Sequence, residues 1–287
     1  MYTIALEQRQ YQTYVLSDQE ANSRVEVVPE RGGIVTSWQV DGREMFYMDT
    51  ERFTHPDLTV RGGIPILFPI CGGLPNNTYT HNGQEYTLKQ HGFARNLPWQ
   101  VTGQSTQDGA GLTVTLESND ETRAGYPFDF QVDFTYILKG DQLEILQKYT
   151  NRSQESMPFS TGLHPYFAVT DKTQLRFNIP ATELIDHRTL SHHSFAESFD
   201  FEQDEIDVAF PDLTAHSASV GDGALELKVY YDTTYSVLVF WTVKGKPFYC
   251  LEPWTSLRNA MITGDRLVSL PPGETLTTTV RLTAGMR

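Results

Sequence analysis

The chain has 287 residues, with 22 basic and 36 acidic side chains, and its net charge is −14 when histidine is neutral. This acidic balance argues against nucleic acid and against an anionic membrane surface as partners. It does not exclude a small anionic ligand, because a local group of arginines can override a distant negative field.

The N-terminal residues 1–10 lack the basic and apolar regions of a signal peptide, and no stretch approaches the length of a membrane span. The two cysteines, Cys71 and Cys250, both lie among apolar residues, which favours buried free thiols over a disulfide. We therefore expect a cytoplasmic protein without a membrane partner, present as a monomer or a homodimer.

Period-two alternation of apolar side chains predicts β-strands along most of the chain. In the first half we expect strands at residues 11–16, 24–28, 34–40 and 112–117. Residues 119–125 follow, where we expect at most one helical turn.

The clearest strand covers residues 130–138, where five apolar side chains share one face. Lys139-Gly140-Asp141 then predicts a turn, and Leu143 and Ile145 continue on the return strand. Similar alternation predicts strands at residues 225–231 and 276–282.

The polar stretch 186–207 predicts a long excursion over the surface, of a kind that is often functional or mobile. No linker and no repeat divides the chain, so we expect one domain over residues 1–287. Many strands with almost no helix predict an all-β fold of stacked, mainly antiparallel sheets.

Charged side chains interrupt apolar, glycine-containing and proline-containing sequence at residues 61–69 and 91–96. Arg61, His91 and Arg95 are the candidates for ligand binding, because the forked donors of arginine suit hydroxyl pairs and phosphate oxygens. The structural alternatives weigh about as much: the arginines could pair with carboxylates such as Asp57, and His91 could be a turn residue without a role.

Glu252 and His164 are the candidates for proton transfer. Glu252 ends an apolar stretch before Pro253, and a carboxylate removed from water becomes more basic. His164 can give and take a proton near neutral pH. Taken alone, Glu252 would more often be a structural partner of an arginine such as Arg258, and His164 could equally be a core residue bound to a carbonyl.

The sequence lacks the motifs that usually mark other kinds of site. We find no Walker loop, dinucleotide fingerprint or Gly-x-Ser-x-Gly elbow. The remaining histidines have no ligand-like spacing, and the adjacent His192 and His193 would point to opposite sides of an extended chain. We therefore expect neither a metal nor a cofactor.

Four segments, taken together and in order, resemble the aldose 1-epimerase (galactose mutarotase-like) family, and most closely its hexose-6-phosphate mutarotase-type branch. The matching segments are residues 61–69, 91–96 with Trp99, 163–167 and 250–254. The resemblance spans nearly the whole chain. It implies a β-supersandwich of large antiparallel sheets and interconversion of the α and β anomers of an aldohexose or hexose 6-phosphate.

The resemblance also implies roles for single residues. Glu252 would take the proton of the C1 hydroxyl while His164 protonates the ring oxygen. His91, Arg61 and Arg95 would hold the sugar or its phosphate, together with Asp207, which has Asp204 and Asp212 as close competitors in the sequence. The aromatic residues Phe68, Tyr166 and Trp254 would either face the sugar or belong to the core.

One departure concerns specificity. The free-sugar mutarotases carry Asn-His-Ser-Tyr-Phe where this chain has Leu163-His164-Pro165-Tyr166-Phe167, so the sequence argues against a close copy of the galactose enzyme. The alternative function is a non-catalytic carbohydrate-binding or sugar-sensing protein on the same fold. Glycoside hydrolysis is weaker still, since it needs two placed carboxylates and only Glu252 lies in a motif.

Overall fold

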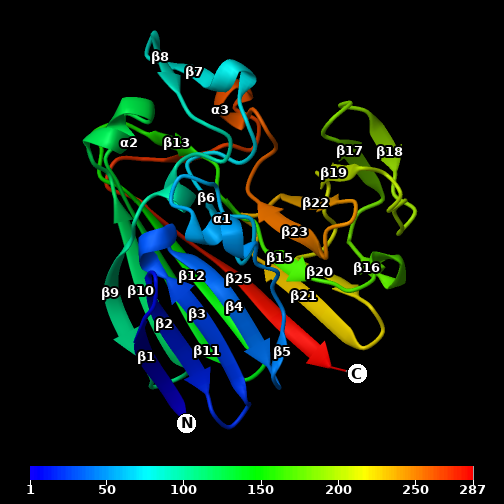
Figure 1. Ribbon diagram of the computed structural model, residues 1–287. Helices are drawn as coiled ribbons and strands as arrows, with labels where there is room; N and C mark the ends of the chain where they lie inside the picture. Colours follow the sequence, from blue (N-terminus) through cyan, green and yellow to red (C-terminus); the bar gives the residue numbers. More distant parts are fainter. Residues whose placement is uncertain (287) are drawn as a thin grey trace.

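The computed structural model describes residues 1–286 and confirms the all-β fold class (Figure 1). Three large sheets account for most of the strands, and the neighbouring strands within them are antiparallel. None of the helices within residues 1–286 is long and apolar enough to cross a membrane.

The N-terminal sheet has five strands in sequence order, and its first three strands pack on the large sheet described next. Its strands are β1 (Tyr2–Gln8), β2 (Gln12–Asp18), β3 (Ser23–Val28), β4 (Ile34–Val40) and β5 (Arg43–Glu44).

The second sheet has eight strands and contains the long hairpin that the sequence predicts most clearly. In spatial order its strands are β16 (Arg176–Asn178), β20 (Ser217–Gly221), β21 (Leu225–Tyr231), β25 (Thr275–Met286), β12 (Gln142–Asn151), β11 (Phe130–Lys139), β10 (Ala110–Glu117) and β9 (Gln100–Ser105).

The third sheet also has eight strands and carries Glu252 and Asp207, two of the site residues discussed below. Its strands in spatial order are β18 (His192–Ser194), β17 (Glu183–Asp186), β19 (Glu205–Phe210), β22 (Val237–Val243), β23 (Phe248–Trp254), β14 (Gly162–Leu163) and β6 (Ile66–Leu67), with β15 (Tyr166–Ala168) also paired to β23.

Two small pairs of strands and a few short helices complete the described chain. The pairs are β7 (Thr78–His81) with β8 (Gln84–Thr87), and β13 (Met157–Phe159) with β24 (Val268–Leu270). The helices are α1 (Thr50–Thr54), α2 (Asp120–Gly125) and α3 (Ala260–Thr263), and the 3-10 turns are η1 (Pro29–Arg31), η2 (Pro75–Asn77), η3 (Ala94–Asn96) and η4 (Lys172–Gln174).

The predicted strands are confirmed with small shifts at their ends. β4 has the predicted bounds, and β11 and β12 flank the predicted turn at Gly140. The helical turn predicted at residues 119–125 is α2, which begins at a capping box between Asn119 and Thr122. The sequence did not predict α1 and α3. Both cysteines are buried and free, as expected.

The stretch 186–207 differs from its prediction as one surface excursion. Much of it is exposed, but it contains β18 and the start of β19, and His187 and Asp207 near its two ends are buried. Those two side chains hydrogen-bond each other, which explains why the ends of a polar stretch turn inward.

The core is continuous beneath the third sheet and the segment 61–69. Phe68 is fully buried, and its ring lies near the rings of Phe93, Tyr126, Phe130, Tyr149 and Phe159. This aromatic cluster packs the end of the segment 61–69 against the second sheet, to which Phe130 and Tyr149 belong. It also assigns Phe68 to the core rather than to a ligand-facing surface.

Candidate active site

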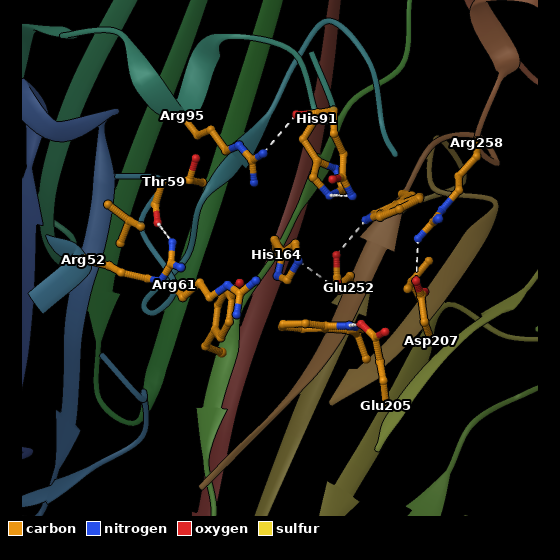
Figure 2. Close-up of a pocket in the computed structure, with 16 residues that line it drawn as sticks. Arg52, Thr59, Arg61, His91, Arg95, His164, Glu205, Asp207, Glu252 and Arg258 are labelled. Atoms are coloured by element: carbon orange, nitrogen blue, oxygen red, sulfur yellow. Dashed lines mark hydrogen bonds and ion pairs between the residues drawn. The ribbon is translucent and has the colours of Figure 1, made fainter. Parts of the chain in front are cut away.

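A cavity of about 380 Å³ opens on the third sheet, between strands β15, β19, β22 and β23 and the segments 52–61 and 90–95 (Figure 2). All six site residues predicted from the sequence line it. Strand register explains how they meet: Asp207 lies opposite Trp241, Trp241 opposite Cys250, and Cys250 opposite Tyr166. Residues in register point to the same face of a sheet, so distant segments of the chain share one wall.

Glu252 and His164 form the centre of the cavity wall. Glu252 is 1% exposed, and its Oε1 lies 3.4 Å from Nε2 of His164. Its other oxygen, Oε2, accepts a hydrogen bond of 3.0 Å from the indole nitrogen of Trp254. Burial, with the nearby Asp207 charge, raises the pKa of Glu252 well above its usual value. We call Glu252 and His164 the dyad.

His164 lies between β14 and β15, with its ring stacked on Tyr166 at 4.8 Å between centroids. Burial and then the Arg95 charge lower the pKa of His164 to about 3. Because burial disfavours charge on both members, one proton shared between the carboxyl and the imidazole leaves the dyad without charge.

His91 presents a fixed ring to the cavity. Its backbone has a φ of 66°, and its Nδ1 accepts a hydrogen bond of 3.1 Å from the backbone N–H of Gly72. An accepting Nδ1 places the proton of the neutral ring on Nε2, which makes Nε2 a donor. This Nε2 lies 3.3 Å from the side-chain amide nitrogen of Gln90. Burial and the Arg95 charge keep the pKa of His91 well below its usual value, so the ring stays neutral.

Arg61 and Arg95 have no carboxylate partner within residues 1–286, so the predicted alternative of pairing with Asp57 is wrong. Arg95 donates to the carbonyl of Gln90 at 2.9 Å, and its Nε is buried without a partner. The Arg61 guanidinium is exposed and lies 5.8 Å from the ring centre of Trp241. Both cations remain available to a ligand.

Arg52 is a third arginine at the cavity, and no motif in the sequence pointed to it. It lies on α1, donates to the carbonyl of Thr59 at 3.4 Å, and stays 3.9 Å from Asp49. Figure 2 shows Arg52, Arg61 and Arg95 on one side of the dyad. We call these three residues the arginine wall.

Asp207 lies on the opposite side of the dyad, next to Arg258 (Figure 2). It accepts hydrogen bonds from Arg258 Nη2 at 2.6 Å and from the ring of His187 at 2.9 Å. Burial opposes ionisation, but these two partners outweigh it and keep the pKa of Asp207 below its usual value. Arg258 therefore pairs with Asp207, and the predicted alternative of pairing with Glu252 is wrong.

The competing aspartates, Asp204 and Asp212, do not line the cavity. Asp212 pairs with Arg266, and the backbone carbonyl of Asp204 accepts from Lys244. Glu205 and Trp241 are further cavity residues that the sequence did not single out; the Trp241 indole donates to Glu205 at 2.7 Å. Tyr166 and Trp254 line the cavity as aromatic faces, unlike Phe68.

Cys250 adds a thiol beside the dyad. One donor atom each from Cys250, His164 and Glu252 lie within 4.8 Å of one another. Metals bind the thiolate rather than the thiol, and here burial and then Glu252 raise the pKa of Cys250 well above its usual value.

The profile of the aldose 1-epimerase family matches residues 12–283. The Slr1438 protein from Synechocystis sp. PCC 6803 has a solved structure that is 42% identical in sequence, with 100% of each chain covered and a TM-score of 0.96. A galactose mutarotase-like protein from Clostridium acetobutylicum shares the fold, with a TM-score of 0.83 at 20% identity over 100% of this chain and 99% of the other.

A protein from Cenchrus ciliaris named "Putative glucose-6-phosphate 1-epimerase" is 29% identical over 202 residues, which is 64% of this chain and 57% of that protein. The family match spans most of the chain and agrees with the galactose mutarotase-like fold. The chain therefore belongs to the aldose 1-epimerase family and is an isomerase of the epimerase type.

Proposed function

We propose that the protein interconverts the α and β anomers of an aldohexose or hexose 6-phosphate by acid–base ring opening. The observation that carries this proposal is the buried contact of 3.4 Å between Glu252 and His164 at the cavity. Ring opening needs one group to take a proton and another to give one, and a dyad that holds a single proton supplies both.

In the productive arrangement Glu252 is ionised and His164 is protonated. Glu252 removes the proton of the C1 hydroxyl, the electrons of that O–H bond form the carbonyl, and the C1–O5 bond breaks as His164 protonates O5. Rotation about C1–C2 and the reverse proton transfers then close the ring as the other anomer. Proton transfer between Oε1 and Nε2 links this arrangement to the uncharged resting dyad without changing the number of protons.

The residues around the dyad suit the hydroxyl groups of a sugar. The Nε2 of His91 is a donor, and the ionised Asp207 is an acceptor held in place by Arg258 and His187. Donors and acceptors that are already oriented lower the cost of fixing the sugar for reaction. We assign His91 and Asp207 to sugar binding on these grounds.

The arginine wall supports a phosphorylated sugar as one substrate. Arg61 and Arg95 have no counter-ion within the described chain, and arginine forks match phosphate oxygens. The family relative from Cenchrus ciliaris carries glucose 6-phosphate in its name. A free hexose would leave these charges bound only to carbonyls, an aromatic ring and water.

The test is the rate of anomer exchange, measured by NMR with glucose and with glucose 6-phosphate. We expect wild type to accelerate exchange and Glu252→Gln to slow it by at least about tenfold, since one acid–base group typically contributes about a hundredfold or more. Glu205→Gln is a matched control, because Glu205 is another cavity carboxylate that accepts from an indole nitrogen. Glu205→Gln should lose much less of the exchange rate than Glu252→Gln.

Equal exchange rates for wild type and Glu252→Gln would refute the mechanism. Binding of either sugar without any acceleration by wild type would instead support a non-catalytic carbohydrate-binding or sugar-sensing protein. The buried dyad argues against that alternative, since binding alone gains nothing from two desolvated ionisable groups.

A further inference from the structure

A turn outside the cavity contacts both chain segments that carry the arginine wall: the segment with Arg52 and Arg61, and the segment with Arg95. Residues 29–33 comprise η1 and then Gly32 and Gly33, whose φ angles are 84° and 64°. We call this segment the 29–33 turn. None of its residues lines the cavity, yet it contacts both segments that carry the wall.

Arg31 binds the half of the wall that carries Arg52 and leads to Arg61. Its side chain is 7% exposed and donates to five carbonyl oxygens within residues 52–58. The acceptors are Arg52 at 3.2 Å, Phe53 at 3.3 Å, His55 at 2.8 Å, Pro56 at 3.1 Å and Leu58 at 2.5 Å.

These carbonyls lie at the end of α1 and in the turn after it, where the helical bonding pattern stops. The carbonyl of His55 also accepts from the backbone N–H of Leu58 at 3.2 Å. No carboxylate among the described residues pairs with Arg31, so carbonyl dipoles balance its charge. The guanidinium thus orders the backbone segment that contains Arg52 and leads to Arg61, although Arg31 does not line the cavity.

Gly32 and Pro29 hold the other half of the wall. A Cβ atom at Gly32 would lie 2.2 Å from the carbonyl oxygen of Arg95, so the turn touches the backbone of η3 directly. The carbonyl of Pro29 accepts from the backbone N–H of Trp99 at 3.0 Å, and the Trp99 indole donates to Ala94 at 2.9 Å.

We propose that the 29–33 turn is the positioning element of the arginine wall and sets the distance between Arg52 and Arg61 on one side and Arg95 on the other. Arg31 and Gly32 would thereby determine selectivity for a phosphorylated over a free sugar, without touching either. The proposal rests on the proposed binding of a sugar phosphate. It extends the specificity of the site to residues outside the cavity.

Arg31→Lys tests the first contact. An ammonium group offers three donors from one atom and cannot reach five separate carbonyls, so residues 52–58 lose most of their support. For glucose 6-phosphate we expect the Kd from calorimetry and the KM for exchange to rise about tenfold, as several hydrogen bonds to a charged donor are lost. With glucose, kcat and KM should change less than about threefold, because the dyad is untouched.

Gly32→Ala tests the second contact and remains informative where Arg31→Lys fails to fold. Its control is Gly42→Ala, since Gly42 has a similar φ of 75° but no atom within 4 Å of an added Cβ. Both variants carry the same backbone strain, and only Gly32→Ala displaces Arg95. We expect Gly32→Ala to weaken the binding of glucose 6-phosphate more than that of glucose. We expect Gly42→Ala to bind both sugars as wild type does.

The ratio of affinities for glucose 6-phosphate and glucose decides the outcome, because general destabilisation would affect both sugars alike. An unchanged ratio in Arg31→Lys and Gly32→Ala would overturn the proposal, as would a wild-type protein that binds the two sugars equally. If wild type favours glucose 6-phosphate in binding and the variants lose that preference, the proposal stands even where wild type accelerates no exchange. Absent exchange would then refute only the proposed function.

Discussion

The backbone N–H of Gly72 donates to Nδ1 of His91 at 3.1 Å, and the same glycine packs against the side chain of Arg258. A Cβ atom at Gly72 would lie 2.3 Å from Cγ of Arg258, at a backbone φ of 72°. One residue without a side chain therefore fixes the tautomer of His91 and leaves room for the arginine that holds Asp207.

Gly72→Ala should consequently impair both sugar-binding sides of the cavity. The added methyl group must displace Arg258, and any backbone adjustment weakens the bond to His91. We expect kcat/KM to fall about tenfold or more for glucose and glucose 6-phosphate alike, as when a charged hydrogen-bond partner is misplaced. Anomer exchange by NMR measures this.

Gly83→Ala is the control for Gly72→Ala, because Gly83 has a φ of 78° and no atom within 4 Å of an added Cβ. It introduces similar backbone strain in the β7–β8 turn, away from the cavity. Equal activity of the two variants would show that the Gly72 contacts do not matter to the site.

Several parts of the fold and of the site could be predicted from sequence because they depend on local pattern. Alternation gave β11, β12 and β21 because one face of each strand is buried in the core. Glu252 stood out because an acidic residue follows an apolar run just before Pro253; the structure places it within β23 rather than at the end of the strand. Such signals need only a few neighbouring residues.

Other parts depend on which strands become neighbours, and alternation does not contain that information. Trp241 meets Asp207 only through the pairing of β22 with β19, and Arg258 reaches Asp207 across 51 positions instead of the nearer Glu252. In the sequence, Arg52 resembles any surface arginine. Its place at the cavity depends on distant contacts, such as the hydrogen bond from Arg31 to its carbonyl.

The dyad predicts an unusual dependence of activity on pH. The active form carries one proton, so kcat/KM falls in acid when the dyad gains a second proton and in alkali when it loses the last. The pKa of His164, lowered to about 3 by burial and Arg95, sets the acid limb, and the raised pKa of Glu252 sets the alkaline limb.

We therefore expect no fall in kcat/KM as the pH decreases through about 6.5, where an ordinary histidine gains its proton. Glucose is the substrate for this measurement, because a phosphate group has its own pKa near 6. An acid limb centred near the ordinary histidine value would mean that water reaches His164 and that the dyad is not held neutral.

Stability should also respond to Glu252. Its pKa is higher in the folded than in the unfolded protein, so the folded state binds this proton more tightly and loses that advantage as the pH rises towards the folded pKa. Glu252→Gln removes the ionisation but keeps groups that can accept from Trp254 and donate to His164.

The Tm of Glu252→Gln should therefore rise relative to wild type as the pH increases above about 4.5, and the two should converge in more acidic buffer. Calorimetry across this range measures the difference. Glu274→Gln, at an exposed carboxylate, should show no such trend. A Tm difference that is constant with pH would contradict the raised pKa of Glu252.

Arg61 offers the most direct test of phosphate recognition, because it is exposed, belongs to the arginine wall and contacts no carboxylate in the described chain. Arg61→Ala should raise the KM for glucose 6-phosphate by about tenfold, as expected for the loss of one charge-assisted contact, and should change the KM for glucose far less. Arg61→Lys keeps the charge but loses the fork and the planar contact with Trp241, so its effect should be intermediate. Equal losses for both sugars would remove Arg61 from phosphate recognition and leave it as a packing partner of Trp241.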